Sequence, residues 1–314
     1  MHLLITGGAG FVGANLVRRL LADAASHQVV VIDDLSTGDR RNLTGLDADL
    51  RVATILDPPA LTDAMSGADA VVHLAAIPSV PRSVRDPLAS HEANATGTLR
   101  VLEAARSTGC GHVILASSSS VYGAHPELPK HEGLRPAPMS PYAASKLAGE
   151  SYARAYATCY GLDVLAFRFF NIFGPLQPAG HAYAAVVPAF VDAALAGRPL
   201  PLEGDGTQTR DFTYVATVTE VITNALVRRV SSPDPVNLAF GTRTSLRELI
   251  GLLEEAVGHA LEVEDRPTRP GDVPHSQADN TRLRTLFPDV VPVDLATGLA
   301  ATIAWFRSQG AGSA

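Results

Sequence analysis

A glycine-rich turn near the start of the chain restricts the possible folds more than any other feature. Gly7, Gly10 and Gly13 recur at every third position, directly after an apolar strand and at the opening of a helix. The first glycine permits a tight turn, the second lets backbone amides approach a phosphate, and the third lets the helix pack closely on the strand. The free amides at the helix start, including those of Phe11 and Val12, carry a partial positive charge. The turn therefore predicts a dinucleotide pyrophosphate site.

The rest of the N-terminal half alternates short apolar runs with helical patterns, which is typical of βαβ units and a parallel sheet. The runs are nearly continuous in apolar residues, as expected when both faces of a sheet are covered. The predicted strands span residues 3–6, 29–33, 51–55, 70–75, 112–117 and 163–169. The predicted helices span residues 10–23, 61–65, 94–108 and 140–160. We predict an α/β fold with a Rossmann-type, doubly wound parallel sheet over residues 1–170.

The second half of the chain has a different composition. Proline and glycine are frequent in residues 174–182 and 199–212, and an extended, proline-rich segment covers 262–280. Periodicity predicts three helices and one short strand, at residues 183–196, 215–228, 245–257 and 235–238. We predict a smaller C-terminal α/β lobe over residues 171–314 that binds substrate above the carboxyl edge of the sheet. Residues around 213–238 are expected to return to the first domain.

An acidic residue at the end of the second predicted strand indicates which dinucleotide binds. Asp33 follows the glycine turn by about 20 residues, the spacing of a ribose-binding acid in a dinucleotide site. A carboxylate there accepts hydrogen bonds from the adenosine ribose and repels a 2′-phosphate, which favours NAD over NADP. The alternative is that Asp33 or Asp34 only caps a turn.

A tyrosine and a lysine are expected to lie on one face of a later helix. Tyr142 and Lys146 are four residues apart, and Ser140 followed by Pro141 is a helix-start signal. A tyrosine of pKa near 10 is a weak base at neutral pH. The lysine ammonium and the positive nicotinamide of NAD⁺ are expected to lower that pKa. The alternative is an exposed pair of no function.

Four serines, residues 117–120, end an apolar strand just upstream of this helix. A hydroxyl at the carboxyl end of a strand points into the crevice where open α/β sheets bind ligands. We therefore expect a hydroxyl of this run to bridge a substrate oxygen and Tyr142. One of these serines, Tyr142 and Lys146 form the predicted catalytic set.

Composition excludes several other classes of protein. The 314 residues are 46% apolar and 18% charged, with a net charge of −7, which argues against binding nucleic acid. Neither cysteine, Cys110 or Cys159, has a disulfide or metal-ligand spacing, and the histidines show none either, so no metal is expected. His73 is expected to be structural. No apolar stretch approaches the roughly 18 residues that span a bilayer. With no room for a signal peptide, a cytoplasmic protein without membrane contact is expected.

Several further stretches extend these motifs along the chain. They are residues 72–76, 94–98, 168–175, 204–212 and 269–273. With the glycine turn and the catalytic set, they make the chain resemble the extended short-chain dehydrogenase/reductase family, in particular its NAD-dependent UDP-glucose and UDP-N-acetylglucosamine 4-epimerases. The resemblance implies a tightly bound NAD that is recycled through a transient 4-keto sugar. It also implies a homodimer, through the helices predicted at 94–108 and 140–160.

The resemblance implies individual roles for many residues. Besides the glycine turn and Asp33, the cofactor contacts would come from Asp34, Ser36, Thr37, Gly38, Asp57, Leu74, Ala75, Ala76, Asn94, Ser117, Tyr142 and Lys146. Asp57 would lie near the adenine, and Lys146 near the nicotinamide ribose. Ser118 matches the position of the family's catalytic serine or threonine, which makes Ser118, Tyr142 and Lys146 the predicted catalytic set. The substrate contacts would come from Ser79, Ser118, Ser119, Tyr142, Asn171, Val187, Arg210, Arg269, Asp272 and Ser276. Arg210 and Arg269 would pair with the two phosphates of a UDP-sugar, which suits the bidentate geometry of arginine.

Departures from related branches narrow the reaction. The dehydratase branch typically carries Thr-Asp-Glu where this chain has residues 118–120, and the decarboxylase branch carries a glutamate near Ser120. Serines supply neither the acid nor the base of an elimination, so 4-epimerisation is favoured. A UDP-glucuronate 4-epimerase, a 4,6-dehydratase, a 4-ketoreductase and a non-catalytic NAD-binding regulator remain the alternatives.

One position indicates the size of the sugar. Ser276 matches a site with tyrosine in hexose-restricted members of the family and with serine or cysteine in members that accept N-acetyl groups. A small side chain leaves volume beside the C2 substituent. We expect UDP-GlcNAc and UDP-GalNAc to be interconverted, with UDP-Glc and UDP-Gal tolerated.

Overall fold

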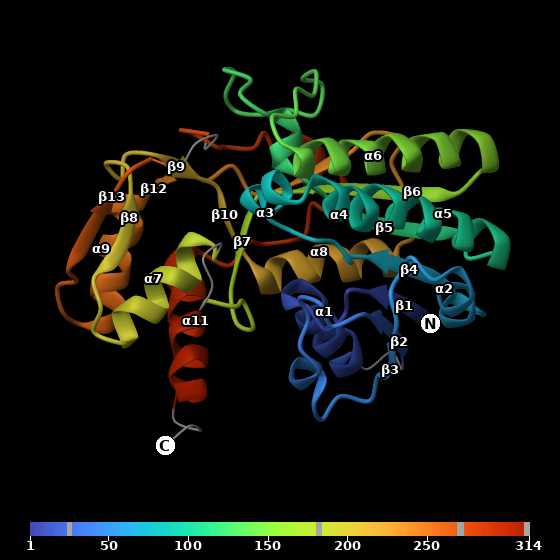
Figure 1. The fold of residues 1–314 in the computed structure, drawn as a ribbon, viewed down its shortest axis with the longest axis horizontal. Coiled ribbons are helices and arrows are strands. Elements are labelled where there is room, and N and C mark those ends of the chain that lie inside the picture. Colours follow the sequence, from blue (N-terminus) through green and yellow to red (C-terminus); the bar gives the residue numbers. More distant parts are fainter. Residues whose placement is uncertain (24–26, 180–183, 269–272, 311–314) are drawn as a thin grey trace.

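The structure is a computed structural model that describes residues 1–23, 27–179, 184–268 and 273–310. A large domain and a smaller lobe lie side by side (Figure 1). The large domain contains a seven-stranded sheet in which all neighbouring strands run parallel. In spatial order the strands are β3 (Asp49–Val52), β2 (Gln28–Asp33), β1 (His2–Thr6), β4 (Ala70–His73), β5 (His112–Ser118), β6 (Asp163–Phe169) and β11 (Val236–Leu238). The predicted Rossmann-type α/β fold is confirmed.

Helices cover both faces of this sheet (Figure 1). Helices α1 (Phe11–Ala22) and α8 (Val215–Val227) pack on one face, and α2 (Pro58–Met65), α5 (Gly97–Thr108) and α6 (Pro141–Tyr160) pack on the other. Successive side chains of a strand point to opposite faces, so Leu3 and Ile5 join the first core and Leu4 joins the second. Both faces are buried, which explains why the strands are continuously apolar.

The order of the strands reverses between β1 and β4. From β1 the chain builds outward through β2 and β3, and from β4 it builds the other way through β5 and β6. In open α/β sheets this reversal opens a crevice at the carboxyl ends of the strands, and ligands bind there. The turn that starts at Gly7 and the loop that starts at Leu74 leave the sheet at this point.

The smaller lobe has a core of its own, formed largely by α7 (Val186–Leu195), α9 (Leu246–Val257) and α11 (Leu295–Gly310). The lobe also holds a parallel pair of strands, β8 (Leu200–Glu203) and β13 (Val263–Arg266). Between these elements the chain crosses back to the sheet, where α8 packs against α1 and β11 pairs with β6. Within the described residues, no helix has the length and apolar character needed to cross a bilayer.

Two short pairs of strands connect the lobe to the sheet. Strand β7 (Asn171–Phe173) pairs with β10 (Phe212–Tyr214) in parallel, and β9 (Thr209–Arg210) pairs with β12 (Thr244–Ser245) in antiparallel fashion. Figure 1 shows β7 and β10 between the two parts of the molecule. Because β7 follows β6 directly, residues that leave the carboxyl end of the sheet enter this connection.

Several predicted boundaries were wrong. Strand β3 ends at Val52 and not at residue 55, because Thr54 accepts a hydrogen bond from the amide of Leu56 and the chain turns. Strand β4 ends at His73 and not at residue 75, since the amide of Ala75 donates to the side chain of Thr6. The helix predicted from residue 94 is preceded by a π-helical segment, Glu92–Thr96. The helices missed by the prediction are α3 (Val80–Arg85), α4 (Pro87–His91), α10 (Thr281–Leu286) and α11.

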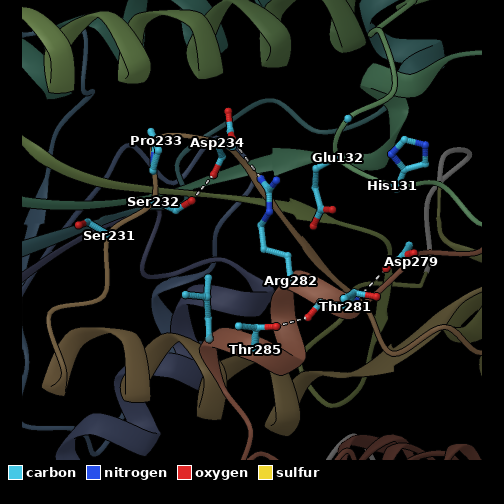
Figure 2. Close-up of a pocket in the computed structure, with 12 residues that line it drawn as sticks. His131, Glu132, Ser231, Ser232, Pro233, Asp234, Asp279, Thr281, Arg282 and Thr285 are labelled. Carbon is cyan, nitrogen blue, oxygen red and sulfur yellow. Dashed lines mark hydrogen bonds and ion pairs between the residues drawn. The ribbon is translucent and has the colours of Figure 1, made fainter.

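The outer edge of the sheet, at β11, is covered by side chains and loops. Glu132 accepts a hydrogen bond from the Asn237 amide at 2.9 Å, and Arg282 donates to the Pro235 carbonyl at 2.8 Å. A cavity of about 870 Å³ lies beside this edge, and Figure 2 shows Arg282 reaching across it to Asp234, 3.7 Å away. These contacts satisfy backbone groups that an open edge would offer to another chain.

A buried carboxylate, Asp211, lies in the connection between the lobe and the sheet, which comprises β7, β9, β10 and β12 and is called the lobe connection below. Asp211 is fully buried and accepts hydrogen bonds from the Gly241 amide, the Thr242 hydroxyl and the Ala278 amide at 2.9–3.0 Å. Burial raises the pKa of Asp211 to about 6. The group therefore joins strand residues 209–214 to two segments that lie far away in the sequence.

We expect the Asp211→Ala substitution to lower the free energy of unfolding by about 3 kcal/mol at neutral pH, because it leaves three buried donors without an acceptor and an unsatisfied buried group costs about 1–3 kcal/mol. Urea unfolding measures the change. The matched control is Asp265→Ala, on the exposed strand β13. An equal loss in both variants would contradict the assigned role.

Candidate active site and cofactor site

The glycine turn has the geometry of a phosphate cradle. Gly7 has a φ of +70°, and a Cβ there would lie 2.6 Å from the amide nitrogen of Ala75. A Cβ on Gly13 would lie 2.3 Å from the carbonyl oxygen of Gly7. Gly10 is the N-cap of α1 and provides no side-chain hydrogen bond to the helix start. The amides at the start of α1, including those of Phe11 and Val12, therefore receive no side-chain cap from Gly10, which suits pyrophosphate binding.

Asp33 lies at the end of β2 beside this turn. Its carboxylate is only 7% exposed and accepts hydrogen bonds from the Ala9 and Leu35 amides, both at 2.9 Å. Burial is the largest influence on Asp33 and raises its pKa. The bond from Leu35 shows that Asp33 does cap the following turn. A carboxylate has about four acceptor positions, so two positions remain for ribose hydroxyls.

The segment after Asp33 forms the outer wall of the predicted adenosine site. Asp34 is exposed and accepts a hydrogen bond from the Ser36 amide at 2.9 Å, and Ser36 and Thr37 are exposed as well. A Cβ on Gly38 would lie 2.9 Å from both carboxylate oxygens of Asp33, so a glycine keeps the space beside them open.

The loop after β4, which includes Leu74, Ala75 and Ala76, is held by Asn94. The Asn94 side chain accepts from the Ile77 amide at 2.8 Å and donates to the Ile77 carbonyl at 3.2 Å and to the Ser145 hydroxyl at 3.1 Å. Asn94 is 1% exposed. Its side chain therefore shapes the loop and links it to α6, and it lies in the π-helical segment, a form that is frequent at functional sites.

Two predicted cofactor residues use their side chains within the protein. Asp57 is the N-cap of α2 and accepts from the Ala60 amide at 3.2 Å. The hydroxyl of Ser117 is buried and donates to Glu150 of α6. Because this hydroxyl is already used, Ser117 could contact a cofactor only through its backbone.

The three predicted catalytic residues meet where α6 crosses the end of β5. Ser140 caps α6 by accepting from the Ala143 amide at 3.1 Å, which places Tyr142 in the first turn. Ser118, at the end of β5, hydrogen bonds to Tyr142, and the Lys146 ammonium donates to the Ala116 carbonyl at 2.9 Å. The four-residue spacing places Tyr142 and Lys146 on the same face of α6, facing the strand.

Burial controls the charges of this set. The pKa of Tyr142 is raised, chiefly by burial, and only the hydrogen bond from Ser118 lowers it. The expected lowering by Lys146 is therefore not found. Burial also lowers the pKa of Lys146 to about 8. The protein by itself holds Tyr142 as a neutral phenol, and a further positive charge is needed to favour the phenolate.

An ion pair beneath the catalytic set was not predicted. Glu150 lies one turn after Lys146 on α6 and pairs with Arg168 of β6 through two hydrogen bonds of 2.9 and 2.7 Å. Both side chains are buried, and the Arg168 guanidinium lies 4.6 Å from the ring centroid of Tyr122. Through Ser117 the pair also reaches β5, so it fixes α6 against both strands. The motif around Arg168 was recognised, but nothing in the sequence named its partner.

The predicted substrate residues fall into two groups. Ser79 and Ser119 lie on the sheet side, at the N-cap of α3 and directly after Ser118. Ser79 has a φ of +111°, which is unusual for a residue with a side chain and is typical of strained positions at functional sites.

The second group lies in the lobe connection. Asn171 begins β7, and Arg210 on β9 donates to the Thr209 and Pro274 carbonyls at 2.9 and 3.3 Å. The amide of Ser276 donates to the Thr209 carbonyl at 3.0 Å, so Arg210 and Ser276 lie on neighbouring segments. Val187 is buried in the core of the lobe, and a substrate contact would fall to its backbone. Arg269 and Asp272 lie outside the described residues.

Known proteins resemble this chain over nearly its whole length. Residues 3–239 match the NAD dependent epimerase/dehydratase family. A UDP-glucose 4-epimerase of Mycolicibacterium smegmatis is 40% identical, over 98% of this chain and 99% of that protein. A solved UDP-N-acetylglucosamine 4-epimerase from Methanobrevibacter ruminantium is 34% identical, with a TM-score of 0.92 and 98% of both chains covered. The chain belongs to the NAD dependent epimerase/dehydratase family.

Membership of this family makes NAD the cofactor, and the residues present fit it. A dTDP-glucose 4,6-dehydratase from Streptomyces venezuelae, solved with NAD bound, is 34% identical with a TM-score of 0.90, over 99% of this chain and 98% of that one. In the present chain the turn at Gly7 has no room for a Cβ, and the Asp33 carboxylate keeps free acceptor positions beside Gly38. Similar proteins include both epimerases and dehydratases, so the family points to an enzyme that acts on nucleotide sugars.

The buried ammonium of Lys146 costs stability, and replacing it tests its charge state. The pKa of Lys146 falls from 10.5 to about 8 on folding. Below pH 8 the lysine is charged in both states, and its burial costs the protein about 3 kcal/mol. As the pH rises from 8 towards 10.5, the unfolded chain keeps the proton that the folded protein loses, so stability rises and the cost disappears.

We therefore expect Lys146→Met to be more stable than the parent protein at about pH 7 and to lose this advantage by about pH 10. Urea unfolding at the two pH values measures the difference. A difference that is independent of pH would contradict the assigned charge state.

Proposed function

We propose that this protein is an NAD-dependent UDP-sugar 4-epimerase that interconverts UDP-GlcNAc with UDP-GalNAc and tolerates UDP-Glc and UDP-Gal. The observation that carries the proposal is the cluster of Ser118, Tyr142 and Lys146 at the carboxyl edge of the sheet, beside the NAD cradle. A non-catalytic NAD-binding regulator would need only the glycine turn and Asp33. Retention of Ser118, Tyr142 and Lys146 together supports an enzyme.

Each side chain of the set has a task in this reaction. NAD, when bound, supplies a hydride acceptor and donor at C4 of the sugar, and its positive nicotinamide favours the Tyr142 phenolate. Tyr142 removes the proton of the C4 hydroxyl, and Ser118 orients the oxygen through its hydrogen bond to Tyr142. The Lys146 ammonium adds positive charge on the same face of α6. When the 4-keto sugar has turned over in the site, Tyr142 returns the proton.

Binding of the nucleotide keeps the sugar in place while it turns. Arg210 is the described arginine proposed to hold the phosphates, and Asn171 lies at the start of the same connection. Binding energy from the remote nucleotide then confines a keto sugar that must itself be free to rotate. A four-residue run without carboxylates, at 117–120, supports epimerisation over dehydration, because elimination needs both an acid and a base beside the sugar.

The decisive experiment replaces the proposed base. We expect Tyr142→Phe to lower kcat at least about 100-fold, since a positioned proton-transfer group contributes about 10²–10⁴-fold. Conversion of UDP-GlcNAc and of UDP-Glc, without added NAD, is followed by NMR. The control is Tyr152→Phe, which removes an exposed hydroxyl from the same helix. Formation of a C4 epimer by Tyr142→Phe at the parental rate would refute the mechanism, and a stable 4-keto or dehydrated product would favour a dehydratase.

A second substitution tests the sugar. A phenol at position 276 fills volume proposed for the N-acetyl group, so we expect Ser276→Tyr to lower kcat/KM for UDP-GlcNAc relative to UDP-Glc by about tenfold or more. Ser276→Ala, which adds no volume, is expected to leave the ratio unchanged. If neither sugar reacts with the parent protein, even with NAD supplied, UDP-glucuronate and dTDP-hexoses are the next substrates to test.

A further inference from the structure

His73 lies at the end of β4 and bridges two threonines. Its Nδ1 is 2.7 Å from the Thr6 hydroxyl on β1, and its Nε2 is 2.9 Å from the Thr98 hydroxyl on α5. The ring is 4% exposed. A histidine buried in this way can be a simple packing residue, but its neighbours determine the position of its proton.

The donors and acceptors around the ring permit one neutral tautomer. The Thr98 hydroxyl has a single proton, and it donates that proton to the Asn94 carbonyl at 2.6 Å. Thr98 can then only accept from His73, so Nε2 carries the hydrogen. Nδ1 of the neutral ring is left as an acceptor, and it receives the proton of the Thr6 hydroxyl. Thr6 in turn accepts from the amide of Ala75 at 3.2 Å.

The charges around the ring favour the neutral form. Burial and, to a lesser extent, the nearby Lys146 ammonium together lower the pKa of His73 to about 3. A second proton on the ring would also have to displace the proton that Thr6 donates. His73 is therefore held neutral across the physiological range, and all its hydrogen-bonding groups are satisfied.

One end of this chain of hydrogen bonds lies at the loop after β4, residues 74–76, which we call the cofactor loop. The other end lies at helix α6, which carries Tyr142 and Lys146. At one end, Ala75 belongs to the loop that contacts the glycine turn. At the other, Asn94 donates to Ser145 of α6, and the Ser145 hydroxyl donates to the Tyr142 carbonyl at 2.8 Å. His73 is the link between β1, β4 and α5 that completes this path.

We propose that His73 is a positioning residue, fixed as the neutral Nε2–H tautomer, that sets the cofactor loop against the helix carrying Tyr142 and Lys146. The proposal deepens the proposed function, but it requires only that NAD binds at the loop. It predicts that NAD affinity depends on the hydrogen bonds of the ring and not merely on the volume that the ring fills.

The tautomer can be observed directly. Long-range ¹H–¹⁵N correlation of the ¹⁵N-histidine-labelled protein with NAD bound distinguishes the two neutral forms and the imidazolium. The His73 signals are assigned in the parent protein by the through-space contacts of the ring with Thr6 and Thr98, so no variant is needed. We expect the Nε2–H pattern, unchanged from about pH 5.5 to about pH 8.5, a range in which an ordinary histidine titrates. An Nδ1–H pattern or titration within this range would overturn the proposal.

Substitutions then separate positioning from packing. The nitrogen of a glutamine amide replaces Nε2–H, and the oxygen of an asparagine amide replaces Nδ1, so each variant keeps one of the two bonds. We expect His73→Gln and His73→Asn each to weaken NAD binding about tenfold and His73→Leu about a hundredfold, as the loss of one or two hydrogen bonds implies. NAD affinity is measured by calorimetry, beside the thermal midpoint of each variant.

The matched control is another buried histidine. His112 is 1% exposed and its Nε2 contacts the Val230 carbonyl at 3.0 Å, at the opposite end of β5. His112→Gln is expected to lower the thermal midpoint and leave NAD affinity unchanged. If the His73 variants also keep parental NAD affinity, His73 only packs and the proposal fails; if they do not fold, the tautomer measurement decides. Neither readout requires turnover, so an inactive parent protein would refute the proposed function and leave this inference standing.

Discussion

The site depends on how α6 is held against the ends of β5 and β6. Three successive turns of this helix contribute Tyr142, Lys146 and Glu150, and the last two bind the strands directly. The Glu150–Arg168 pair is buried, and an ion pair in that position is costly unless its hydrogen bonds are nearly complete. Removing either partner would leave an unpaired charge inside the protein. The pair thus penalises any other placement of α6, and it fixes the distance between Tyr142 and Ser118.

The same burial that fixes the helix opposes the charges that catalysis needs. It raises the pKa of Tyr142 and lowers that of Lys146, so burial opposes the charged form of both, although Lys146 stays charged below about pH 8. The proposed mechanism requires the opposite state of at least the tyrosine. Positive charge from the cofactor is the contribution that reverses this preference, which couples activation of the base to occupation of the NAD site. Stability and activity are in conflict at these two residues.

The sequence predicted the parts of the site that are local in the chain. The glycine turn, Asp33 and the Tyr142–Lys146 pair are recognisable because their spacing alone sets their geometry. Partners that are distant in sequence could not be predicted: Asn94 was assigned to the cofactor, but its side chain binds a loop and a helix, and Ser117 binds Glu150. Asp211 was part of a recognised stretch, yet its three donors come from segments about 30 and 67 residues away, which no local pattern reports.

Two parts of the structure, which we call the sheet frame and the lobe frame, meet at the proposed substrate site. The sheet frame carries the cradle and the catalytic set, and it is fixed by buried polar contacts among β1, β4, β5 and α6. The lobe frame carries Arg210 and Ser276, and it is fixed by Asp211 and by backbone bonds from the segment at residues 274–276 to Thr209. In the proposed function, chemistry at C4 depends on the first frame, while the fit of a C2 substituent depends on the second. Under this proposal a relative can change its sugar through the lobe while its proton and hydride chemistry stays the same, and similar proteins do include both a UDP-glucose and a UDP-N-acetylglucosamine 4-epimerase.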